Sequence, residues 1–179
     1  AIIGSVGAGK STLISALLGE VPLINGEIHV NGSIAYAAQI PWIQNMSLKD
    51  NILFCSEKND IKIQTLYNQA LEQAALLPDI SILPAGDKTE IGERGINLSG
   101  GQKSRVSLCR VLVASSISDI ILLDDPFSAV DGATGNWMFH KGIMQGLAGK
   151  TRVVVLNSHL HLLRHFDRII ILEDGNISA

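Results

Sequence analysis

The sequence is poor in aromatic side chains and in cysteine. Phe, Trp and Tyr together make up 4% of the 179 residues, whereas hydrophobic residues as a whole make up 46%. The core must therefore be built from Ile, Leu, Val and Ala, which suits helices layered on a β-sheet. The two cysteines, Cys55 and Cys109, lack the spacing of a metal or redox motif, so we expect free thiols in a reducing cytosolic compartment.

Long hydrophobic runs and an excess of positive charge are also absent. No uninterrupted hydrophobic run exceeds about five residues, far short of the roughly 20 that a membrane-spanning helix needs, so we expect no direct membrane insertion. The net charge of −3 gives no general basic field, which argues against nucleic acid as the main partner. The length suits one domain with its own core, so we expect residues 1–179 to form a single domain.

A glycine-rich loop lies near the start of the chain. Residues 4–11 read Gly-Ser-Val-Gly-Ala-Gly-Lys-Ser, between a short apolar segment and a helix-like run over residues 12–19. A strand, a glycine turn and a helix in this order predict a phosphate-binding loop, because glycines let backbone N–H groups wrap around phosphate at the positive helix end. Lys10 would reach the β- and γ-phosphates, and Ser11 would ligate Mg²⁺. Because only three residues precede Gly4, we expect further strands of the domain upstream of this sequence.

Two segments of alternating polarity follow this loop and helix. Residues 27–30 and 33–36 flank Asn31-Gly32, a pair typical of a β-hairpin turn. Gln39 comes directly after the second segment. It therefore stands at a strand end, where ligands gather in open α/β sheets.

The middle of the chain has helical patterning. Ser47 and Asp50 have the spacing of a capping box for a short helix. Hydrophobic residues recur at intervals of three and four over residues 61–77, which predicts a longer helix with one packed face. We therefore expect a helical subdomain over about residues 40–115, inserted in a sheet-based core.

A second glycine-rich helix start lies at residues 98–102, which read Leu-Ser-Gly-Gly-Gln and open a helix expected to end near residue 115. Ser99, Gly100 and Gly101 can present backbone N–H groups to an anion. No lysine is positioned there to neutralise a phosphate, so this end should bind weakly and act as a second clamp. Residues 89–95 before it are polar and glycine-rich, and on their own predict a loop.

An acidic pair ends a buried strand further along. Residues 120–123 read Ile-Ile-Leu-Leu and are followed by Asp124 and Asp125. This placement suits a Mg²⁺ ligand and a water-activating base, while solvated acids at a strand end remain the alternative. Asp131 is a suitable N-cap for the next helix. We expect its large apolar residues to lie in the core: Trp137, Met138 and Met144.

The end of the chain combines strands with several histidines. Residues 152–156 predict a central strand with His159 just beyond it, and residues 168–177 predict a closing hairpin. No cysteine or carboxylate cluster accompanies His159, His161 and His165 in the sequence. The pattern therefore does not favour a metal site built from these histidines.

In their order along the chain, the two glycine motifs, the acidic strand end and the last strand's histidine resemble the nucleotide-binding domain of an ABC ATPase. Residues 98–102 match that family's signature in full, and the phosphate loop and signature together are highly specific. The resemblance covers essentially the whole chain. It implies an α/β fold with a RecA-like P-loop NTPase core, a mainly parallel sheet, a helical subdomain and small antiparallel hairpins. It also implies hydrolysis of ATP with Mg²⁺ in a head-to-tail pair with a second nucleotide-binding domain.

The resemblance also implies a role for particular residues. Lys10 and Ser11 match the Walker A positions, Asp124 matches the Walker B aspartate, and residues 128–131 match the D-loop. The implied catalytic residues are Asp125, His159 as the switch histidine, and Gln39 of the Q-loop. The implied Mg²⁺ contacts are Ser11, Gln39 and Asp124. The implied nucleotide contacts are Gly4, Ser5, Val6, Gly7, Ala8, Gly9, Lys10, Ser11 and Thr12 in the loop and Ser99, Gly100, Gly101 and Gln102 in the signature.

Two segments resemble exporters in particular. Residues 40–54 look like the C-subfamily, the multidrug-resistance-associated type, and residues 89–95 resemble the loop before the signature in ABC exporters. This likeness implies a site of action at the cytoplasmic face of a membrane, with transmembrane domains as partners. Trp42 is then a candidate contact with a coupling helix of those domains; a surface aromatic packed locally is the alternative.

Two positions depart from the family pattern. The family's general base is a glutamate directly after the Walker B aspartate, and here that position holds Asp125. The missing methylene draws the carboxylate back by more than about 1 Å, which can cost roughly 10²-fold in rate. We therefore expect tight ATP binding and slow hydrolysis. The resemblance implies that the same substitution is usual in the first nucleotide-binding domain of C-subfamily transporters. The family's adenine-stacking aromatic residue would lie upstream of Ala1, so adenine binding by this segment is in question.

Three functions follow from these patterns. The leading hypothesis is the ATP-driven motor domain of a membrane exporter. A regulatory module that binds ATP with little turnover is the second, and Asp125 favours it. A soluble ABC ATPase acting on DNA or ribosomes would carry a coiled-coil insertion or basic arms between Gln39 and Ser99, but that span is only about sixty residues long and has no basic run.

Overall fold

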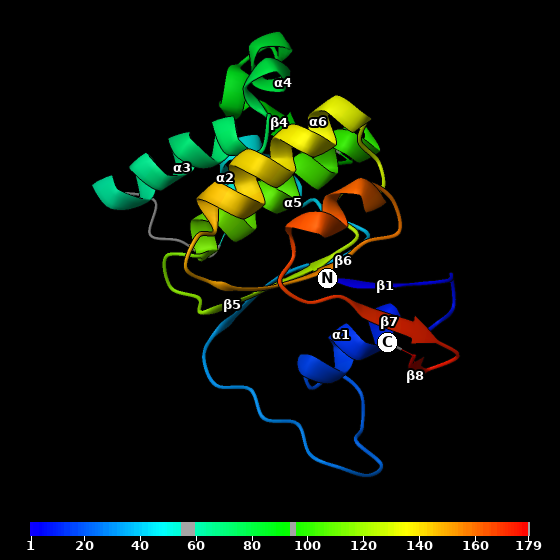
Figure 1. Cartoon of the computed structure of the whole chain (residues 1–179). Coiled ribbons are helices and arrows are strands. Elements are labelled where there is room, and N and C mark those ends of the chain that lie inside the picture. Colours follow the sequence, from blue (N-terminus) through cyan, green and yellow to red (C-terminus); the bar gives the residue numbers. More distant parts are fainter. Residues whose placement is uncertain (55–59, 94–95, 179) are drawn as a thin grey trace.

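A central six-stranded sheet organises the chain. The computed structural model describes residues 1–54, 60–93 and 96–178. The sheet order is β2-β5-β6-β1-β7-β8, and β3 pairs with β4 in a separate small sheet (Figure 1). The strands are β1 (Ile2–Gly4), β2 (Ile34–Ala37), β3 (Met46–Ser47), β4 (Glu90–Ile91), β5 (Ile120–Asp124), β6 (Thr151–Val155), β7 (Ile170–Glu173) and β8 (Asn176–Ile177). All pairings in the central sheet are parallel except β7 with β8, which confirms the predicted α/β fold.

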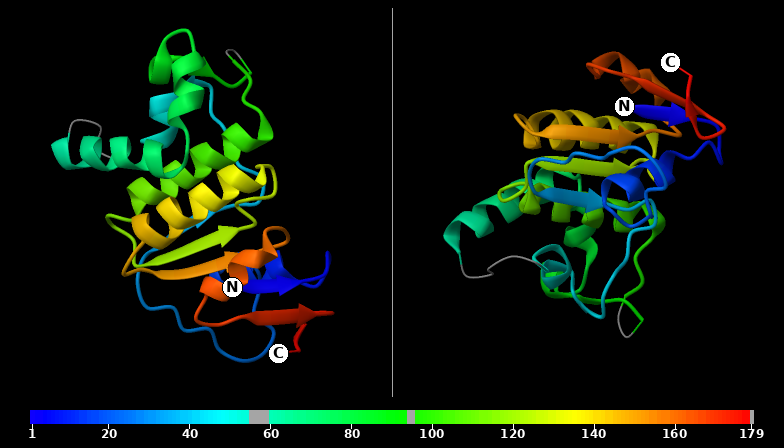
Figure 2. Two further views of the ribbon diagram at one scale, coloured as in Figure 1. Left: turned by 45° about the horizontal axis from the view of Figure 1, so that its top comes forward. Right: turned by 90° about the horizontal axis from the view of Figure 1, so that it is seen from below.

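Helices cover both faces of this sheet. Helix α1 lies on one face, and α3, α5 and α6 lie on the other (Figures 1 and 2). The helices are α1 (Lys10–Leu17), α2 (Leu48–Ile52), α3 (Ile61–Gln73), α4 (Leu77–Ile82), α5 (Gly100–Ala114) and α6 (Gly132–Trp137), with a π-helical segment η2 (Met138–Gly146) and 3-10 turns η1 (Gly86–Lys88) and η3 (Leu160–His165). Within residues 1–54, 60–93 and 96–178, no helix combines the length and apolar character needed to cross a lipid bilayer.

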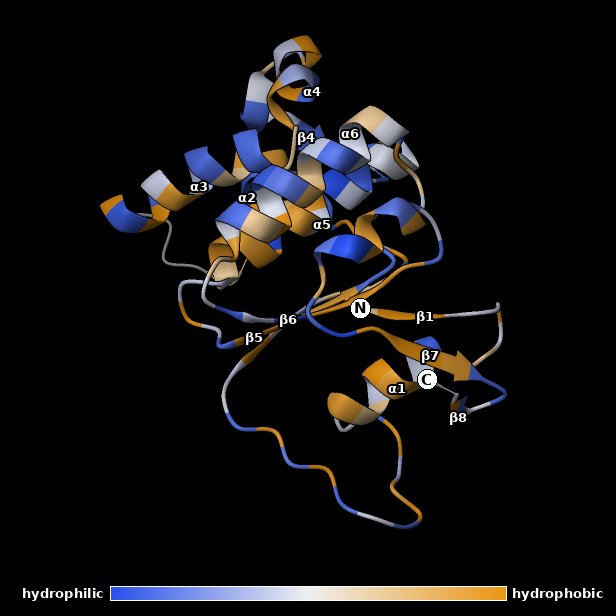
Figure 3. Cartoon of the chain, viewed as in Figure 1, coloured by the Kyte–Doolittle hydropathy of each residue, from blue (hydrophilic) through white to orange (hydrophobic). Residues whose placement is uncertain are grey.

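The central strands are apolar on both sides because both sides are covered. In β5, Ile121 and Leu123 pack with the larger cluster under α3 and α5, whereas Leu122 packs with Ile14 of α1. Figure 3 shows β1 and β7 as largely hydrophobic, while α3 and α6 carry hydrophilic residues on the side in view. A fully buried Leu or Ile contributes about 1.5–3 kcal/mol, so these strands fix the position of the polar residues at their ends.

Helix α3 ends earlier than its hydrophobic pattern predicts. The expected helix over residues 61–77 is wrong at its end, since α3 stops at Gln73. Ala75 has a φ of 56°, and the Leu76 N–H donates to the Leu71 carbonyl oxygen at 2.9 Å, which is a Schellman ending. The apolar pattern continues because α4 starts at once, with Pro78 in its first turn.

The hairpin expected around Asn31-Gly32 does not form. Residues 27–30 are exposed and are not a strand, and β2 pairs in parallel with β5 instead. A two-residue hairpin turn of this type needs positive φ at both residues, and only Gly32, at 122°, has it. A side chain on Gly32 would collide with Asp119, whose carboxylate accepts a bond from the Ser33 N–H at 3.0 Å. The glycine thus permits a close approach to the end of the sheet.

The second expected hairpin is confirmed. Strands β7 and β8 pair antiparallel around Asp174 and Gly175, which have φ values of 47° and 78°. Positive φ at both positions matches the turn that favours short hairpins. The Gly175 N–H also donates to the Ala8 carbonyl oxygen at 3.1 Å, so this turn supports the glycine-rich loop.

The helix after Asp131 is confirmed, with one difference in its side chains. The Asp131 carboxylate accepts bonds from the backbone N–H groups of Ala133 and Thr134, as an N-cap does. Met138 is buried and Met144 packs partly against the core. Trp137 is 43% exposed instead of buried, because its indole N–H donates to a backbone oxygen of α3.

The expectation of free cysteines can be compared with the structure at one position. Cys109 is a free thiol buried within α5, and it lies 3.3 Å from the Ala70 carbonyl oxygen of α3. Burial raises the pKa of the Cys109 thiol far above its usual range. Cys55 lies outside the described residues.

Candidate functional site

The glycine-rich loop joins β1 to α1 and has the backbone that a phosphate cradle needs. Gly7 and Gly9 have φ values of 86° and 98°, where a side chain would be strained. Gly4 leaves no space for a Cβ, because it packs against the backbone of β7. The loop leads into the first turn of α1, which begins at Lys10. The backbone N–H groups of this turn have no partner within the helix. This is the positive end of the helix dipole.

Lys10 and Ser11 start this helix and link the loop to β5. The Lys10 ammonium donates to the carbonyl oxygens of Gly4 and Ser5 at 2.7 and 2.8 Å, and only 6% of the residue is exposed. Burial raises the pKa of the Asp124 carboxyl and Asp125 raises it further, while a hydrogen bond with Ser11 and the charge of Lys10 oppose the rise. The structure thus brings a cation, a hydroxyl and a carboxylate together, as the sequence predicts.

An open pocket of about 220 Å³ lies at this helix start. It is lined by Val6, Gly7, Gly9, Lys10, Ser11, Thr12, Gln39 and Asn157. Gln39 therefore lies where the sequence predicts, at the carboxyl edge of the sheet beside the loop. Asn157 was not singled out from the sequence. The rule that selected Gln39 also applies to it, because it is the first polar residue after β6.

Asp125 lies beside this pocket but not in its lining. The residue is 4% exposed and has a φ of 49°, which is rare outside glycine. Its two carboxylate oxygens accept bonds from Asn157, one from the backbone N–H at 3.3 Å and one from Nδ2 at 2.8 Å. Asp125, the predicted base, is therefore bonded to Asn157, whereas the adjacent Asp124, the predicted metal ligand, interacts with Ser11 and Lys10.

The structure does not bring His159 into the phosphate pocket. His159 has a φ of 55°, and its ring lies against Phe127 with centroids 5.5 Å apart. Its Nε2 is buried without a hydrogen-bond partner and faces Gly135 of α6, where a Cβ would collide with it. Nδ1 lies 3.0 Å from the Ser158 hydroxyl. His159 thus has a left-handed backbone four residues past β6, and its ring lies against α6 and does not line the phosphate pocket.

The histidines offer no metal cluster in the part of the chain that the structure describes. No group of three or more His, Cys, Asp or Glu side chains there could hold a metal ion. His159 and His161 contact each other as tilted rings, with centroids 5.9 Å apart. The candidate cation ligands are instead the oxygen donors beside the loop, Ser11, Gln39 and Asp124, which are the hard ligands that Mg²⁺ prefers.

The signature forms the start of α5, as predicted. Ser99 is the N-cap, its hydroxyl accepts from the Gln102 N–H at 3.2 Å, and the Gln102 side chain accepts from the Ser99 N–H at 2.8 Å. This capping box leaves the other first-turn N–H groups without a partner within the helix. Gly101 packs against the backbone of Ala129, where a Cβ would lie 2.8 Å from the oxygen. The signature does not line the phosphate pocket of its own chain.

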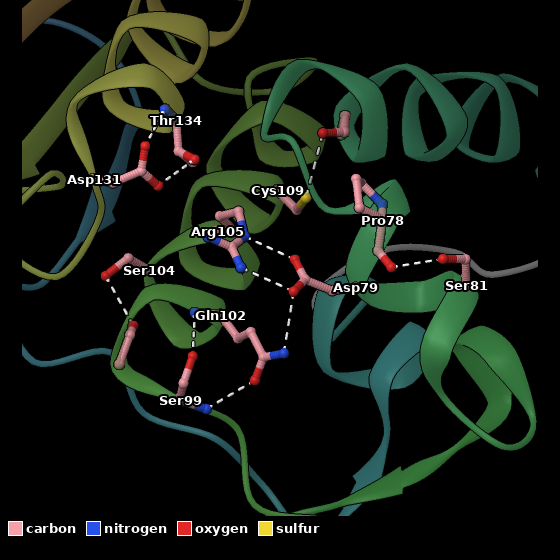
Figure 4. A network of polar contacts seen from close by, with 12 residues as sticks. Pro78, Asp79, Ser81, Ser99, Gln102, Ser104, Arg105, Cys109, Asp131 and Thr134 are labelled. Atoms are coloured by element: carbon pink, nitrogen blue, oxygen red, sulfur yellow. Dashed lines mark hydrogen bonds and ion pairs between the residues drawn. The ribbon is translucent and has the colours of Figure 1, made fainter.

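Asp79 of α4 fixes the start of α5 through a polar network (Figure 4). Its carboxylate accepts from Arg105 Nε and Nη2 at 2.8 and 2.9 Å and from Gln102 Nε2 at 3.1 Å. The side chains of Asp79 and Arg105 are only 15% and 14% exposed. The sequence pattern did not predict that Asp79 and Arg105 are in contact, because the two residues lie in different helices. The network holds the capping side chain of Gln102 in place.

Two further predicted segments can be placed only in part. Of the loop 89–95, residues 94 and 95 lie outside the described residues, and Glu90–Ile91 forms β4 opposite β3. Trp42 is 47% exposed, with the Arg110 guanidinium 3.9 Å from its ring centroid and Phe54 edge-on at 5.2 Å. One face of Trp42 is thus packed locally, and the remainder is open to solvent.

Comparison with known proteins agrees with this geometry. A family model described as ABC transporter matches residues 1–128. The chain is 52% identical over 179 residues to ATP-binding cassette sub-family C member 2 of Rattus norvegicus and 50% identical over 180 residues to sub-family C member 3 of Homo sapiens. ABC transporter C family member 8 of Dictyostelium discoideum is 47% identical. Each match covers 99% of this chain but only 11% of the relative's length.

The matched region contains the glycine-rich loop, the signature and Asp124. The relatives are all named as C-subfamily proteins, which agrees with the predicted subfamily. This chain belongs to the ABC transporter family and is related to the nucleotide-binding regions of its C-subfamily.

Proposed function

We propose that this chain is the ATP-binding domain of a C-subfamily membrane exporter and that it hydrolyses ATP slowly. The observation that carries the proposal is the pocket at the positive end of α1, where Lys10, Ser11 and Gln39 converge. The cradle of backbone N–H groups with a buried ammonium suits the β- and γ-phosphates of a nucleotide. The names of the relatives support ATP as that nucleotide.

We propose Ser11, Gln39 and Asp124 as the residues that would hold Mg²⁺. When bound, the ion would neutralise charge on the phosphate oxygens. The raised pKa of the Asp124 carboxyl reflects burial without a full set of opposing charges, and a cation beside it would supply that charge. Lys10 would orient the terminal phosphates, and Gln39 would position water at the edge of the pocket.

The signature needs a site on another domain. Its exposed helix start presents N–H groups, and it does not line the pocket of its own chain. We therefore propose that it closes the pocket of a second nucleotide-binding domain in a head-to-tail pair, as the resemblance implies. The proposed residues are Ser99, Gly100, Gly101 and Gln102.

We propose that the surface around Trp42 contacts the transmembrane domains at the cytoplasmic face of the membrane. A largely apolar cavity of about 440 Å³ lies there, lined among others by Tyr36, Trp42, Phe54 and Val111. Such a cavity suits the apolar side of a short helix. Residues 40–115, which include Trp42, Phe54 and Val111 of this region, are the proposed helical subdomain.

Replacement of Lys10 tests the proposed ATP site. In the complete protein that contains this chain, Lys10→Ala should weaken ATP binding at this site roughly tenfold or more, because a charge-assisted hydrogen bond is worth about 1.5–3 kcal/mol. The matched control is Lys62→Ala, which removes an exposed lysine of α3. Equal ATP affinity in the two variants, measured with labelled ATP, would contradict the proposal.

A regulatory module that binds ATP and scarcely hydrolyses it is the second candidate. The bonds from Asn157 to both oxygens of Asp125 favour it, since they hold the carboxylate of a residue that does not line the pocket. The ratio of retained ATP to released phosphate at this site separates the two functions. A motor domain releases phosphate in step with transport, whereas a regulatory module keeps intact ATP through many transport cycles.

A further inference from the structure

Asn157 occupies a junction between the phosphate pocket and the Asp125 carboxylate. It lies two residues past the end of β6 and lines the pocket together with Gln39. Its backbone N–H and its side-chain Nδ2 both point at Asp125. This side chain therefore contacts both the pocket and that carboxylate.

The geometry around Asp125 leaves its carboxylate little freedom. The Asp125 N–H donates to the Val155 carbonyl oxygen at 3.1 Å, which fixes the main chain against β6. Each carboxylate oxygen then has a donor from the same neighbour, at 3.3 and 2.8 Å. The orientation of the Asn157 amide is set as well, because its carbonyl oxygen would be repelled by the carboxylate and its NH₂ group is attracted.

A general base needs an open lone pair directed at the water that it activates, at roughly 2.6–3.2 Å. Asp125 is 4% exposed and lines a small cavity with Gln39, Ser107 and Pro126, whose lining does not include Lys10 or Ser11. Its bonds to Asn157 would have to break before either oxygen could turn into the phosphate pocket.

We propose that Asn157 is a positioning residue that restrains Asp125 outside the phosphate pocket and so slows hydrolysis at this site. Slow turnover then has two causes: the side chain of Asp125 is short, and Asn157 holds it in the wrong place. This inference rests on the proposed function, because it concerns the base of the same ATP site.

Carboxyl labelling tests the restraint without any measurement of hydrolysis. In the complete protein that contains this chain, Asn157→Ala should make Asp125 react several-fold more with a carbodiimide and an amine, as mapped by mass spectrometry. Asp119 is the internal reference, since it is an exposed carboxylate at the other end of β5, bonded to Ser33. Unchanged labelling of Asp125 relative to Asp119 overturns the proposal.

Single-turnover kinetics test the consequence. Asn157→Ala should raise the rate of phosphate release at this site on the order of threefold to tenfold, with the KM for ATP changed by less than about twofold. The gain must disappear in the double variant Asn157→Ala with Asp125→Asn, because the released carboxylate is its cause. A rise that persists in the double variant, or an unchanged or lower rate in the single variant, overturns the proposal.

Two further variants separate this inference from misfolding and from the ATP assignment. Alanine and serine at position 157 both keep the backbone N–H, and Asn157→Ser also keeps a small polar side chain. Asn157→Ser therefore replaces Asn157→Ala if thermal unfolding shows that the alanine variant is not folded. Asn136→Ala removes an exposed asparagine of α6 and should leave labelling and rate unchanged. If Lys10→Ala leaves ATP affinity intact, the ATP site is contradicted, whereas the labelling of Asp125 still decides whether Asn157 restrains it.

Discussion

At the scale of single residues, one methylene separates Asp125 from the glutamate that the family places there. The structure adds that Asn157 donates a hydrogen bond to the Asp125 carboxylate, a contact that no sequence motif predicts. Lys10, Ser11 and Asp124 were predictable because their chemistry depends on spacing within a loop and at a strand end. His159 was predicted from its place after a strand, and its positive φ, which the sequence does not reveal, turns its ring toward α6.

Lengthening Asp125 is the residue-scale prediction. Asp125→Glu should raise phosphate release at this site, by up to roughly 10²-fold if side-chain length is the main defect. The longer side chain would move the carboxylate about 1 Å toward the pocket. Single-turnover assays on the complete protein measure the change, with Asp125→Asn as the control that should show no gain. An unchanged rate in the glutamate variant would show that length is not what limits this site.

At the scale of elements, the sequence predicted where helices and strands lie along the chain better than it predicted which elements contact one another. Helix α5 was found from its cap and its apolar spacing, since both signals are local. The hairpin at Asn31-Gly32 was wrong because β2 pairs with β5, more than eighty residues away. The end of α3 was missed because the apolar pattern runs on into α4. Contacts between distant elements, such as Asp79 with Arg105, leave no periodic signal.

The link between α4 and α5 gives the element-scale prediction. Asp79→Ala should lower the free energy of unfolding by about 2 kcal/mol, because it leaves the largely buried guanidinium of Arg105 without its bidentate partner. Urea unfolding of Asp79→Ala, Arg105→Ala and the double variant forms a double-mutant cycle. Simple additivity of the two single effects would contradict the proposed coupling.

At the scale of the whole molecule, the parallel sheet gathers the site. Strands β1, β2, β5 and β6 run in one direction, so their carboxyl ends deliver the loop, Gln39, Asp124 and Asn157 to one edge. The sequence predicted this edge through its motifs, but not the strand order, because parallel neighbours are joined by long crossovers. The second glycine-rich helix start does not line the phosphate pocket at that edge, and this observation carries the proposal of a paired domain.

A charge at Ser99 tests the central claim most directly. Aspartate also caps a helix, so Ser99→Asp keeps the cap while placing a negative charge where the phosphate of a second domain would lie. Ser99→Asn is the neutral control with the same capping ability. The measurement is labelled-ATP occupancy at each nucleotide site of the complete protein.

We predict that Ser99→Asp weakens ATP retention at the second domain's site and leaves binding at Lys10 unchanged, whereas Ser99→Asn changes neither. A loss confined to the site of Lys10, or no loss at either site, would contradict a signature that acts on another domain.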